Sequence, residues 1–328
     1  MGFQQVKTPA YQQRMDEAVR FFTSADKILI LSHLSPDGDT LGSAFALCRA
    51  LLKMGKKARV ICSDPFPEKF KYMYDGLEME EFSPAAIVSV DIASRNLFGR
   101  KLEPFTDKVD FCIDHHPSNT GYAARTLLNP EAAATCEIIL ELVKLLGVEI
   151  NNFIADCIYT GLATDTGCFR YSNTTPQTLR CAAEMMERGA QAAKISKRMF
   201  ETLSRPRLEM ERQVLNSLEY YYEGKVALVY VTREMCEKTG VPDSDLEGIP
   251  SIPVRIEGVL AGITIKEKSP EIYKISLRTN SGVNASEICS NFGGGGHAAA
   301  AGCQIEGSLA QVREKILEAT GKALDGLK

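Results

Sequence analysis

Short apolar runs alternate with helical patterns through the first half of the chain. Runs short enough for buried strands lie at 27–31, 58–62, 85–91 and 109–113. Apolar residues recur at helical spacing at 11–23, 41–52, 133–146 and 153–163. Strands that alternate with helices predict βαβ units and a parallel sheet, so we expect an α/β fold here.

The pattern changes after Gly189. Residues 191–222 are charged and helical in pattern, and we interpret them as a connector whose basic face is either solvated or a binding surface. A second, smaller α/β domain is predicted from strands at 226–231, 254–266 and 272–279 and helices near 283–292 and 308–323. The expected organisation is therefore a first domain at 1–190, a connector at 191–222 and a second domain at 223–328.

Composition narrows the function classes. The chain has 328 residues, enough for two domains, and its net charge of -4 argues against a long basic groove for duplex nucleic acid. Its 10 cysteines form no C-x-x-C pair, as is typical of free thiols in a reducing compartment. No apolar stretch approaches a membrane span, and the first residues are polar. We expect a cytoplasmic protein that does not bind a membrane.

The candidate chemistry starts in the stretch from Ser32 to Ser43. His33, Asp37 and Asp39 lie between the first predicted strand and its helix, in a compact Pro-Asp-Gly turn. Ligands of open α/β sheets bind at this carboxyl end of the strands. An ordinary Asp-Gly turn would look the same in isolation. Asp91, Asp114, His115 and Asp165, however, also lie at or just past the end of an apolar element.

All four histidines, His33, His115, His116 and His297, follow a predicted strand or lie in a glycine run. A buried core histidine would be expected on an apolar face instead. The carboxylates beside them are costly to desolvate unless a positive charge pairs with them, and no lysine or arginine is adjacent in sequence. A divalent metal meets this need.

Imidazole and carboxylate ligands without thiolate suit Mn²⁺, with Mg²⁺, Co²⁺ or Fe²⁺ as alternatives. Four aspartates balance the charge of two divalent ions, and two such ions can clamp a phosphoryl group and activate water. The residues therefore predict a metal-dependent phosphoester hydrolase.

Five motifs resemble those of a known superfamily. The segments His33-x-x-Pro-Asp37-Gly-Asp39, Val-Asp91, Asp114-His115-His116 and Thr-Asp165-Thr-Gly resemble, in order, the motifs of the DHH phosphoesterases. The run Phe292 to His297, followed by Ala300-Ala301-Gly302, resembles the DHHA1 signature. The resemblance covers nearly the whole chain. It implies a parallel-sheet DHH catalytic domain joined by the helical connector to a smaller α/β DHHA1 domain that binds substrate.

The resemblance also implies residue roles. One Mn²⁺ would be held by His33 and Asp37, a second by Asp39, His115 and Asp165, and Asp91 would bridge both. His116 would face the phosphate, and Asp114 would orient His115. Ala298 and Ala299 depart mildly from the family, where a larger or polar residue often follows the glycine run.

Substrate contacts are predicted mainly in the second domain. The glycine run, including Gly294, Gly295 and Gly296, leaves backbone N–H groups free to approach a phosphate; a flexible linker is the alternative. Arg278 and His297 are candidates for the far end of a nucleotide. Arg95 and Arg170 each contact a phosphate or are surface charges.

The function implied is hydrolysis of very short oligoribonucleotides (nanoRNase activity), of 3′-phosphoadenosine 5′-phosphate (pAp), or of both. A stand-alone cyclic-di-AMP or pApA phosphodiesterase is the nearest alternative, because the metals would be the same. A non-catalytic nucleotide sensor is the alternative from another class. Such a protein usually lacks one of the metal-ligating residues, and all of them are present in this sequence. Inorganic pyrophosphatases carry a different second domain. A homodimer is possible.

Overall fold

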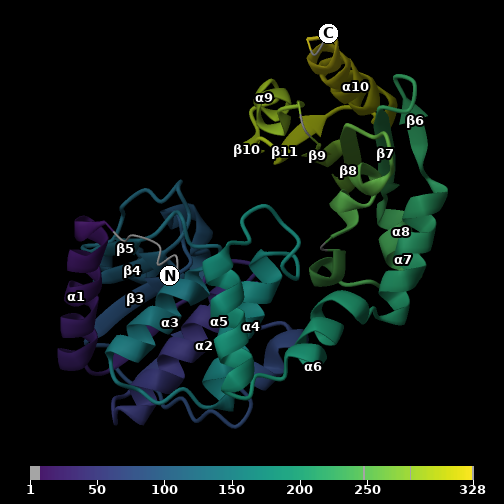
Figure 1. Ribbon diagram of the computed structural model, residues 1–328. Coiled ribbons are helices and arrows are strands. Elements are labelled where there is room, and N and C mark those ends of the chain that lie inside the picture. The colour runs from purple at the N-terminus through teal and green to yellow at the C-terminus, as the bar shows by residue number, and fades with distance from the viewer. Residues whose placement is uncertain (1–7, 247, 281, 327–328) are drawn as a thin grey trace. The chain divides into compact units, whose positions relative to one another are not determined.

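The computed structural model describes residues 8–246, 248–280 and 282–326. The chain divides into two units, Met1–Thr202 and Leu203–Lys328 (Figure 1). The predicted connector at 191–222 contains the last helices of the first unit and the first helix and strand of the second. Its role as a connector stays a prediction. None of the described helices is both long and apolar enough to span a bilayer.

The first unit is built on a five-stranded sheet in which all neighbouring strands are parallel, in the order β2-β1-β3-β4-β5. Its strands are β1 (Ile28–Leu31), β2 (Ala58–Ile61), β3 (Ala86–Val90), β4 (Phe111–Asp114) and β5 (Thr126–Leu128). Its α-helices are α1 (Pro9–Ser24), α2 (Gly38–Lys53), α3 (Thr135–Leu145), α4 (Asn152–Asp165), α5 (Pro176–Glu187) and α6 (Ala192–Ser196). The predicted α/β class is confirmed, as are the four predicted strands and helices of this half.

Alternation along the strands explains why these short runs are apolar throughout. Ile28 and Ile30 of β1 pack into a large core with α1 to α4, whereas Leu29 and Leu31 pack into a second core on the opposite face. That second core contains 3₁₀ turns at Arg95–Leu97 and Arg100–Lys108. A strand that is buried on both faces is apolar at every position, as is typical of parallel sheets.

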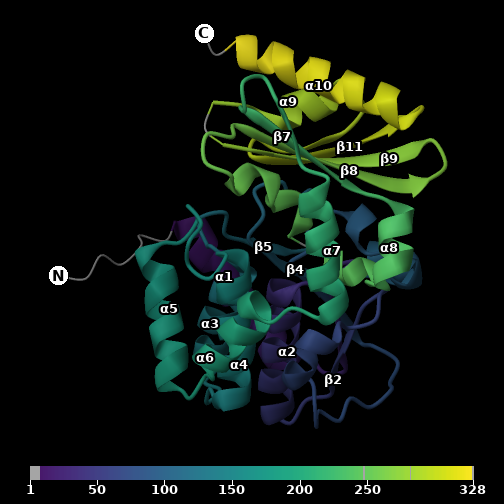
Figure 2. The same ribbon diagram turned by 90° about the vertical axis from the view of Figure 1, so that its right-hand side faces the viewer.

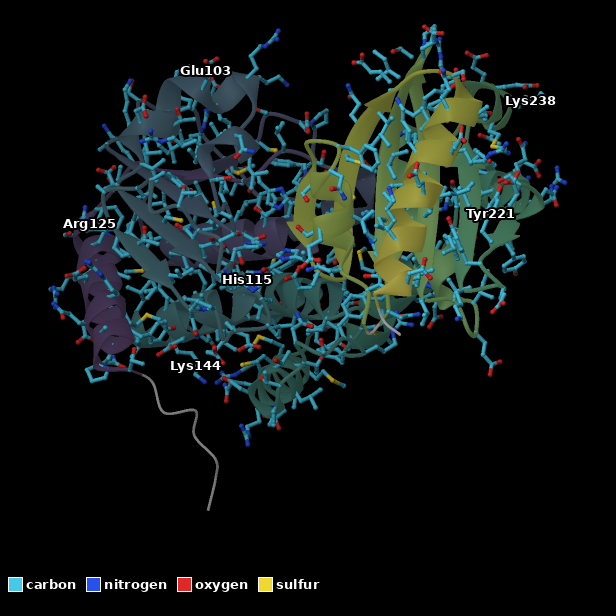
Figure 3. All side chains as sticks on the ribbon, turned by 90° about the horizontal axis from the view of Figure 1, so that it is seen from above. Glu103, His115, Arg125, Lys144, Tyr221 and Lys238 are labelled. Atoms are coloured by element: carbon cyan, nitrogen blue, oxygen red, sulfur yellow. The ribbon has the colours of Figure 1, made fainter. Side chains whose placement is uncertain are left out.

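The edge of this sheet is also closed by side-chain contacts. Arg125, which precedes β5, lies beside α1 in Figure 3, with its guanidinium 4.8 Å from the centre of the Phe21 ring. Phe21 in turn packs against Phe111 of β4. This contact ties the first helix to the strand that carries the DHH motif.

The second unit is built on a six-stranded sheet in the order β10-β11-β9-β8-β7-β6. Only β7 and β8 are parallel neighbours. The strands are β6 (Glu219–Tyr221), β7 (Val226–Val231), β8 (Ala261–Ser269), β9 (Ile272–Thr279), β10 (Gly295–His297) and β11 (Ala300–Glu306). The helices are α7 (Arg205–Asn216), α8 (Arg233–Thr239), α9 (Ala285–Ser290) and α10 (Leu309–Asp325). Helices α9 and α10 cover one face of the sheet (Figure 2).

Several elements differ from the sequence prediction. Strands β5, β10 and β11 and helix α5 were not predicted, and β6 lies in the stretch expected to be helical. The strand expected at 254–266 begins only at Ala261, because residues before it form 3₁₀ turns at Ile249–Ser251 and Pro253–Arg255. Gly258 within this stretch has a φ of 84°, in the left-handed region, so an extended strand does not run through it. The glycine run is partly a strand: Gly295 to His297 form β10 and pair with β11.

Candidate metal centre

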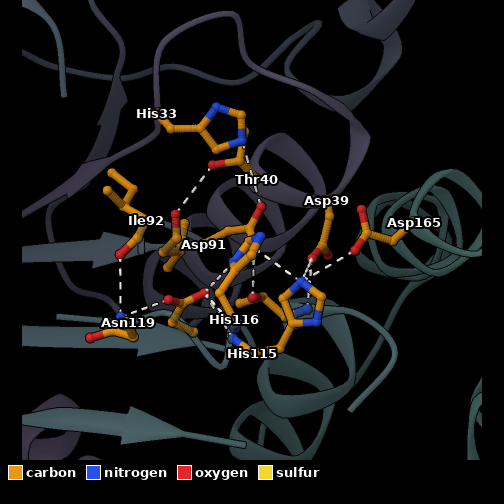
Figure 4. Close-up of polar contacts among 12 residues, drawn as sticks. His33, Asp39, Thr40, Asp91, Ile92, His115, His116, Asn119 and Asp165 are labelled. Atoms are coloured by element: carbon orange, nitrogen blue, oxygen red, sulfur yellow. Dashed lines mark hydrogen bonds and ion pairs between the residues drawn. The ribbon is translucent and has the colours of Figure 1, made fainter. Parts of the chain in front are cut away.

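Three adjacent parallel strands bring the motif residues to one edge of the first sheet. Strands β1, β3 and β4 are neighbours, and their carboxyl ends carry His33, Asp91 and His115. Parallel strands end at the same edge, so these three groups converge although they lie far apart in sequence. Figure 4 shows them together with Asp39, Asp165 and His116.

The other carboxylates of this group, Asp37, Asp39 and Asp165, lie on helices or at a helix N-cap. Asp37 caps the N-terminus of α2, where its Oδ1 atom accepts hydrogen bonds from the N–H groups of Asp39 and Thr40 at 3.0 Å each. Asp165 is the last residue of α4. Helices α2 and α4 approach closely because Gly161 has no side chain: a methyl group there would overlap Cys136 Sγ and lie 2.7 Å from Asp39 Oδ1.

Asp39 is fully buried and fixed by a neighbouring helix. Its carboxylate accepts hydrogen bonds from the N–H groups of Thr135 (2.6 Å) and Cys136 (3.0 Å) at the start of α3. Helix α3 has no side-chain cap of its own, because Ala134 stands at its N-cap, so Asp39 satisfies N–H groups that would otherwise be unpaired. Burial, followed by the charges of Asp91 and Asp165, raises the pKa of Asp39 well above its usual range.

Asp91 lies at the centre of the cluster and is 2% exposed. Its Oδ2 atom lies 3.6 Å from His33 Nε2, and its Oδ1 atom lies 3.7 Å from His115 Nε2. Its backbone has a φ of 59°, in the left-handed region that residues other than glycine rarely adopt. The hydroxyl of Thr135 donates to Oδ1 at 2.9 Å. Each carboxylate oxygen therefore faces a different histidine.

The ring orientations of His33 and His115 are set by backbone carbonyl groups. Nδ1 of His33 lies 2.7 Å from the Leu34 oxygen, and Nδ1 of His115 lies 3.1 Å from the Ala132 oxygen. A ring that donates through Nδ1 presents the lone pair of Nε2 on its other side. In both residues that Nε2 atom is directed at the aspartates.

The electrostatics of this cluster favour a positive charge among its carboxylates. His115 Nε2 is buried and has no hydrogen-bond partner among the described residues, although Asp165 Oδ2 lies only 3.2 Å away. Burial opposes protonation of His33 and His115, but the adjacent carboxylates outweigh it and raise their pKa values to about 11 and about 10. Burial raises the pKa of Asp165 to about 6, although His115 acts in the opposite direction.

Metal-ligand geometry is present in three overlapping groups of side chains. They are His33 with Asp37 and Asp91; Asp39 with His115 and Asp165; and Asp91 with His115 and His116. Ligand atoms within each group lie within 4.8 Å of one another. These residues fit a divalent ion, because the orphaned imidazole nitrogen and the buried carboxylates are donors that such an ion would satisfy.

His116 has a different environment from His115. Its Nδ1 atom lies 2.8 Å from Asp114 Oδ1, and its ring is about one third exposed. Although burial opposes ionisation of Asp114, the hydrogen bond from His116 holds the pKa of that carboxyl below its usual range. The Nδ1 atom of His116, which also faces Asp91 at 3.6 Å, is therefore already hydrogen-bonded to Asp114.

Asp114 does not act as the sequence suggested. We expected it to orient the His115 ring, but it contacts His115 only through the backbone N–H, which donates to its Oδ1 atom at 2.8 Å. The same Oδ1 atom accepts the backbone N–H of His116 at 3.2 Å and lies 2.8 Å from its Nδ1 atom, so Asp114 positions the His116 ring instead. Asn119, which the sequence analysis missed, donates to Asp114 Oδ2 at 2.6 Å and fixes that carboxylate.

Thr135 was also missed, although a signal for it was available. It begins the helix predicted at 133–146, and the free N–H groups of a helix N-terminus attract carboxylates. Arg95 and Arg170 have partners within the first unit. Arg95 pairs with Asp107 at 3.1 Å, and Arg170 donates to the Gly167 carbonyl at 2.6 Å.

The predicted substrate residues of the second unit lie in one row of its sheet. Arg278 of β9 is paired with Ala300 of β11, and Ala300 is paired with His297 of β10. Residues directly opposite one another point to the same face, so Arg278 and His297 share a face with only a methyl group between them. Their neighbours Leu277 and Ala301 point to the other face, into the core with α9 and α10.

The glycines of β10 differ in what their lack of a side chain allows. A methyl group on Gly294 would overlap the Gly302 carbonyl and Cys303, and one on Gly296 would overlap the Ala300 carbonyl. Gly295 faces open space. Close packing against β11 therefore explains Gly294 and Gly296, whereas Gly295 has no packing reason to be glycine.

Comparison with known proteins agrees with these motifs. Residues 27–162 match the DHH family, N-terminal domain, and residues 223–325 match the DHHA1 domain. The chain is 33% identical over 326 residues to the bifunctional oligoribonuclease and PAP phosphatase NrnA of Thermus thermophilus, covering 96% of each chain. This chain belongs to the DHH family. The resemblance seen in the sequence is thereby confirmed.

Two further relatives extend the comparison. The protein of the same name from Bacillus subtilis is 26% identical, with 88% of this chain and 92% of that one covered. An exopolyphosphatase-related protein from Bacteroides fragilis has a solved structure with a TM-score of 0.89 at 27% identity, covering 99% of both chains. As a DHH-family protein with every motif carboxylate and histidine in place, the chain is a hydrolase of phosphoric esters.

Proposed function

We propose that this DHH-family protein hydrolyses very short oligoribonucleotides and removes a phosphate from pAp, using two divalent metal ions, with Mn²⁺ as the favoured ion. The observation that carries the proposal is the convergence of four aspartates on two buried imidazole nitrogens at the carboxyl edge of one sheet. The relatives named as oligoribonuclease and PAP phosphatase cover almost the whole chain, which supports the substrate class.

The geometry supports a division of the ligands into two sets. His33 and Asp37 would hold one ion, Asp39, His115 and Asp165 would hold the other, and Asp91 would serve both through its two oxygens. When bound, such a pair of ions polarises the phosphoryl group and lowers the pKa of water towards about 7. Mg²⁺ and Co²⁺ suit the same ligands.

His116 is the residue we assign to the phosphate. With Nδ1 hydrogen-bonded to Asp114, its Nε2 atom is left to donate to a phosphoryl or leaving-group oxygen. Burial opposes its protonation, but the hydrogen bond to Asp114 and the charge of Asp91 raise the pKa of His116. This shift favours the protonated ring, which is the form in which a general acid donates.

The second unit is proposed to bind the part of the nucleotide that does not react. Arg278, with a guanidinium that can bind a phosphate in two places, and His297 share one face of its sheet. Gly295 adds an unobstructed backbone segment beside them. Arg95 and Arg170 are further candidates for a phosphate contact; Arg95 pairs with Asp107, and Arg170 donates to the Gly167 carbonyl. A homodimer and a cytoplasmic location stay predictions.

The test is a comparison of turnover on pApA, pAp and cyclic-di-AMP with Mn²⁺, Mg²⁺ and Co²⁺. We expect hydrolysis of pApA and pAp, greatest with Mn²⁺, and little with cyclic-di-AMP. A preference for the cyclic substrate would instead support the phosphodiesterase alternative. Tight binding of all three without turnover would support the sensor alternative and contradict the proposal.

Metal binding is tested separately by titration calorimetry on protein stripped with a chelator. Two Mn²⁺ per chain are expected for the wild type and fewer for Asp91→Asn. Asp110→Asn is the matched control, because Asp110 lies at the opposite end of β4 and accepts the Ile87 N–H. One ion per wild-type chain would contradict the two-ion proposal.

A further inference from the structure

An aromatic ring lies exposed on the loop that follows the metal-centre residue Asp165. Tyr171 is 57% exposed, more than any other large hydrophobic or aromatic side chain among the described residues except Leu208. An exposed tyrosine offers an apolar ring and a polar hydroxyl to a partner, and this one lies on the loop next to the metal centre. The sequence analysis gave it no role.

The loop that carries Tyr171 has a strained backbone. Gly167, Cys168 and Phe169 have successive φ values of 55°, 60° and 63°. Two consecutive residues other than glycine in the left-handed region cost about 1–3 kcal/mol each, and such strain persists only where surrounding contacts enforce it. Strain of this kind is concentrated at ligand sites.

Thr166 enforces this conformation. Its carbonyl accepts the N–H groups of Arg170 (2.9 Å) and Tyr171 (3.0 Å), and its hydroxyl accepts that of Phe169 (3.0 Å). The loop then returns to its start, because Asn173 Nδ2 donates to the Asp165 carbonyl at 3.1 Å. Tyr171 is thus held beside Asp165 by backbone contacts that do not involve its own ring.

The ring itself lies flat against Gly167. A methyl group on Gly167 would overlap Cζ, Cε1 and Cε2 of Tyr171 almost equally, so it would meet the face of the ring and not its edge. Glycine therefore supports one face of the ring. With one face supported and more than half of the side chain exposed, the opposite face is available to a planar partner.

We propose that Tyr171 is a stacking platform for the nucleobase of the nucleotide whose phosphate is at the metal centre. The inference rests on the proposed function, since it takes the phosphate to lie at Asp165, and a base lies one ribose away from its phosphate. Every base has a π face, so stacking tolerates all four bases. The platform would give affinity for nucleotides over simple phosphate esters without selecting a sequence.

A direct test uses the absence of tryptophan from the chain. Tyr171→Trp introduces a single tryptophan whose fluorescence reports stacking without any turnover. With Mg²⁺ present, AMP should quench this fluorescence, whereas ribose 5-phosphate should not. Tyr220→Trp is the matched control, because Tyr220 is 54% exposed but lies on β6 of the second unit; AMP should leave it unchanged. Equal quenching by AMP and ribose 5-phosphate would overturn the inference.

A kinetic test separates stacking from packing. Tyr171→Ala and Tyr171→Leu should each raise KM for pAp about tenfold, because stacking of one base on an aromatic ring strengthens binding by about this factor or more. Neither should alter kcat beyond about twofold or change hydrolysis of the base-free analogue, 1-deoxyribose 3,5-bisphosphate. Tyr171→Phe should keep the wild-type KM. Loss of kcat on both substrates, or rescue by Leu as well as Phe, would show that the ring only packs the loop.

The two proposals fail in different ways. Wild-type protein that does not hydrolyse pAp or pApA contradicts the proposed function, whatever the fluorescence shows. Wild-type protein that hydrolyses them, combined with an unchanged KM in Tyr171→Ala, contradicts the stacking platform alone.

Discussion

The metal centre of the first unit and the open sheet face of the second unit place their functional residues by different means. At the metal centre, buried groups form a network of hydrogen bonds. Asp39 caps α3, Thr135 donates to Asp91, and Asn119 donates to Asp114. On the second sheet, strand register aligns Arg278 and His297, and the Arg278 guanidinium also donates to the Leu277 carbonyl at 3.1 Å. Buried, interlocked groups resist substitution because each loss leaves a partner unsatisfied.

The two regions differ in which kinetic constant their residues should determine. Groups that meet the changing charge of a reaction must be held rigidly before it begins, which a buried network provides. Groups that only hold a nucleotide can be more exposed and more tolerant of change. Substitutions among the buried groups of the metal centre should therefore lower kcat, and substitutions of Arg278 or His297 on the second sheet should raise KM.

The largest effect is expected at Asp91. Asp91→Ala should lower kcat/KM for pAp by about 10³-fold or more, a loss of about 4 kcal/mol of transition-state stabilisation. The reason is that Asp91 faces both histidines and thus both proposed ions. His33→Ala removes a ligand of only one proposed ion, so it should lose less activity. Turnover with saturating Mn²⁺ measures both; more than a tenth of wild-type activity in Asp91→Ala would break the two-ion assignment.

His116→Ala should have the next largest effect, a fall of about 10²-fold in kcat, as is usual for loss of a general acid. Its metal content should remain that of the wild type, because the Nδ1 atom of His116 is bound to Asp114 and not free for an ion. Metal analysis of the purified variant decides the point. If Mn²⁺ is lost with the side chain, His116 is a ligand and its role has been misassigned.

On the second unit, Arg278→Ala should raise KM for short oligonucleotides roughly tenfold or more while leaving kcat nearly unchanged, since a charge-assisted hydrogen bond contributes about 1.5–3 kcal/mol. Gly295→Val should act in the same direction, by obstructing a position that is open in the structure. Lys274→Ala is the control, because Lys274 lies on the same face of β9 two pairs further along. A fall in kcat without a change in KM would show that this face shapes the metal centre.

The smallest effect separates two adjacent glycines. Gly294→Ala should lower the melting temperature, because its methyl group would overlap the Gly302 carbonyl and Cys303; overpacking of this kind costs about 1–3 kcal/mol. Gly295→Ala should leave the melting temperature close to that of the wild type. Thermal unfolding of the two variants side by side measures the difference. Equal destabilisation would contradict the assignment of Gly294 to packing and Gly295 to substrate.

The sequence by itself determined four of the five strands of the first sheet and the groups at its carboxyl edge. Apolar runs that end in His33, Asp91 and Asp114-His115 carry enough information, because strand periodicity is local and parallel strands must end together. The motif spacing likewise determined the family. The predicted strand at 254–266 was the least accurate, because a 3₁₀ turn occupies its first residues and the strand begins only at Ala261.

Only the tertiary structure decided which group each side chain contacts. Asp114 turned out to hold His116 and not His115, and Asp39 turned out to cap α3, because these contacts join residues whose distance in space no periodicity encodes. The glycine run shows the same limit. Four identical residues in sequence became different in the fold, where the neighbouring strand closes the space at Gly294 and Gly296 and leaves it open at Gly295. Packing, which depends on every surrounding residue, made that distinction.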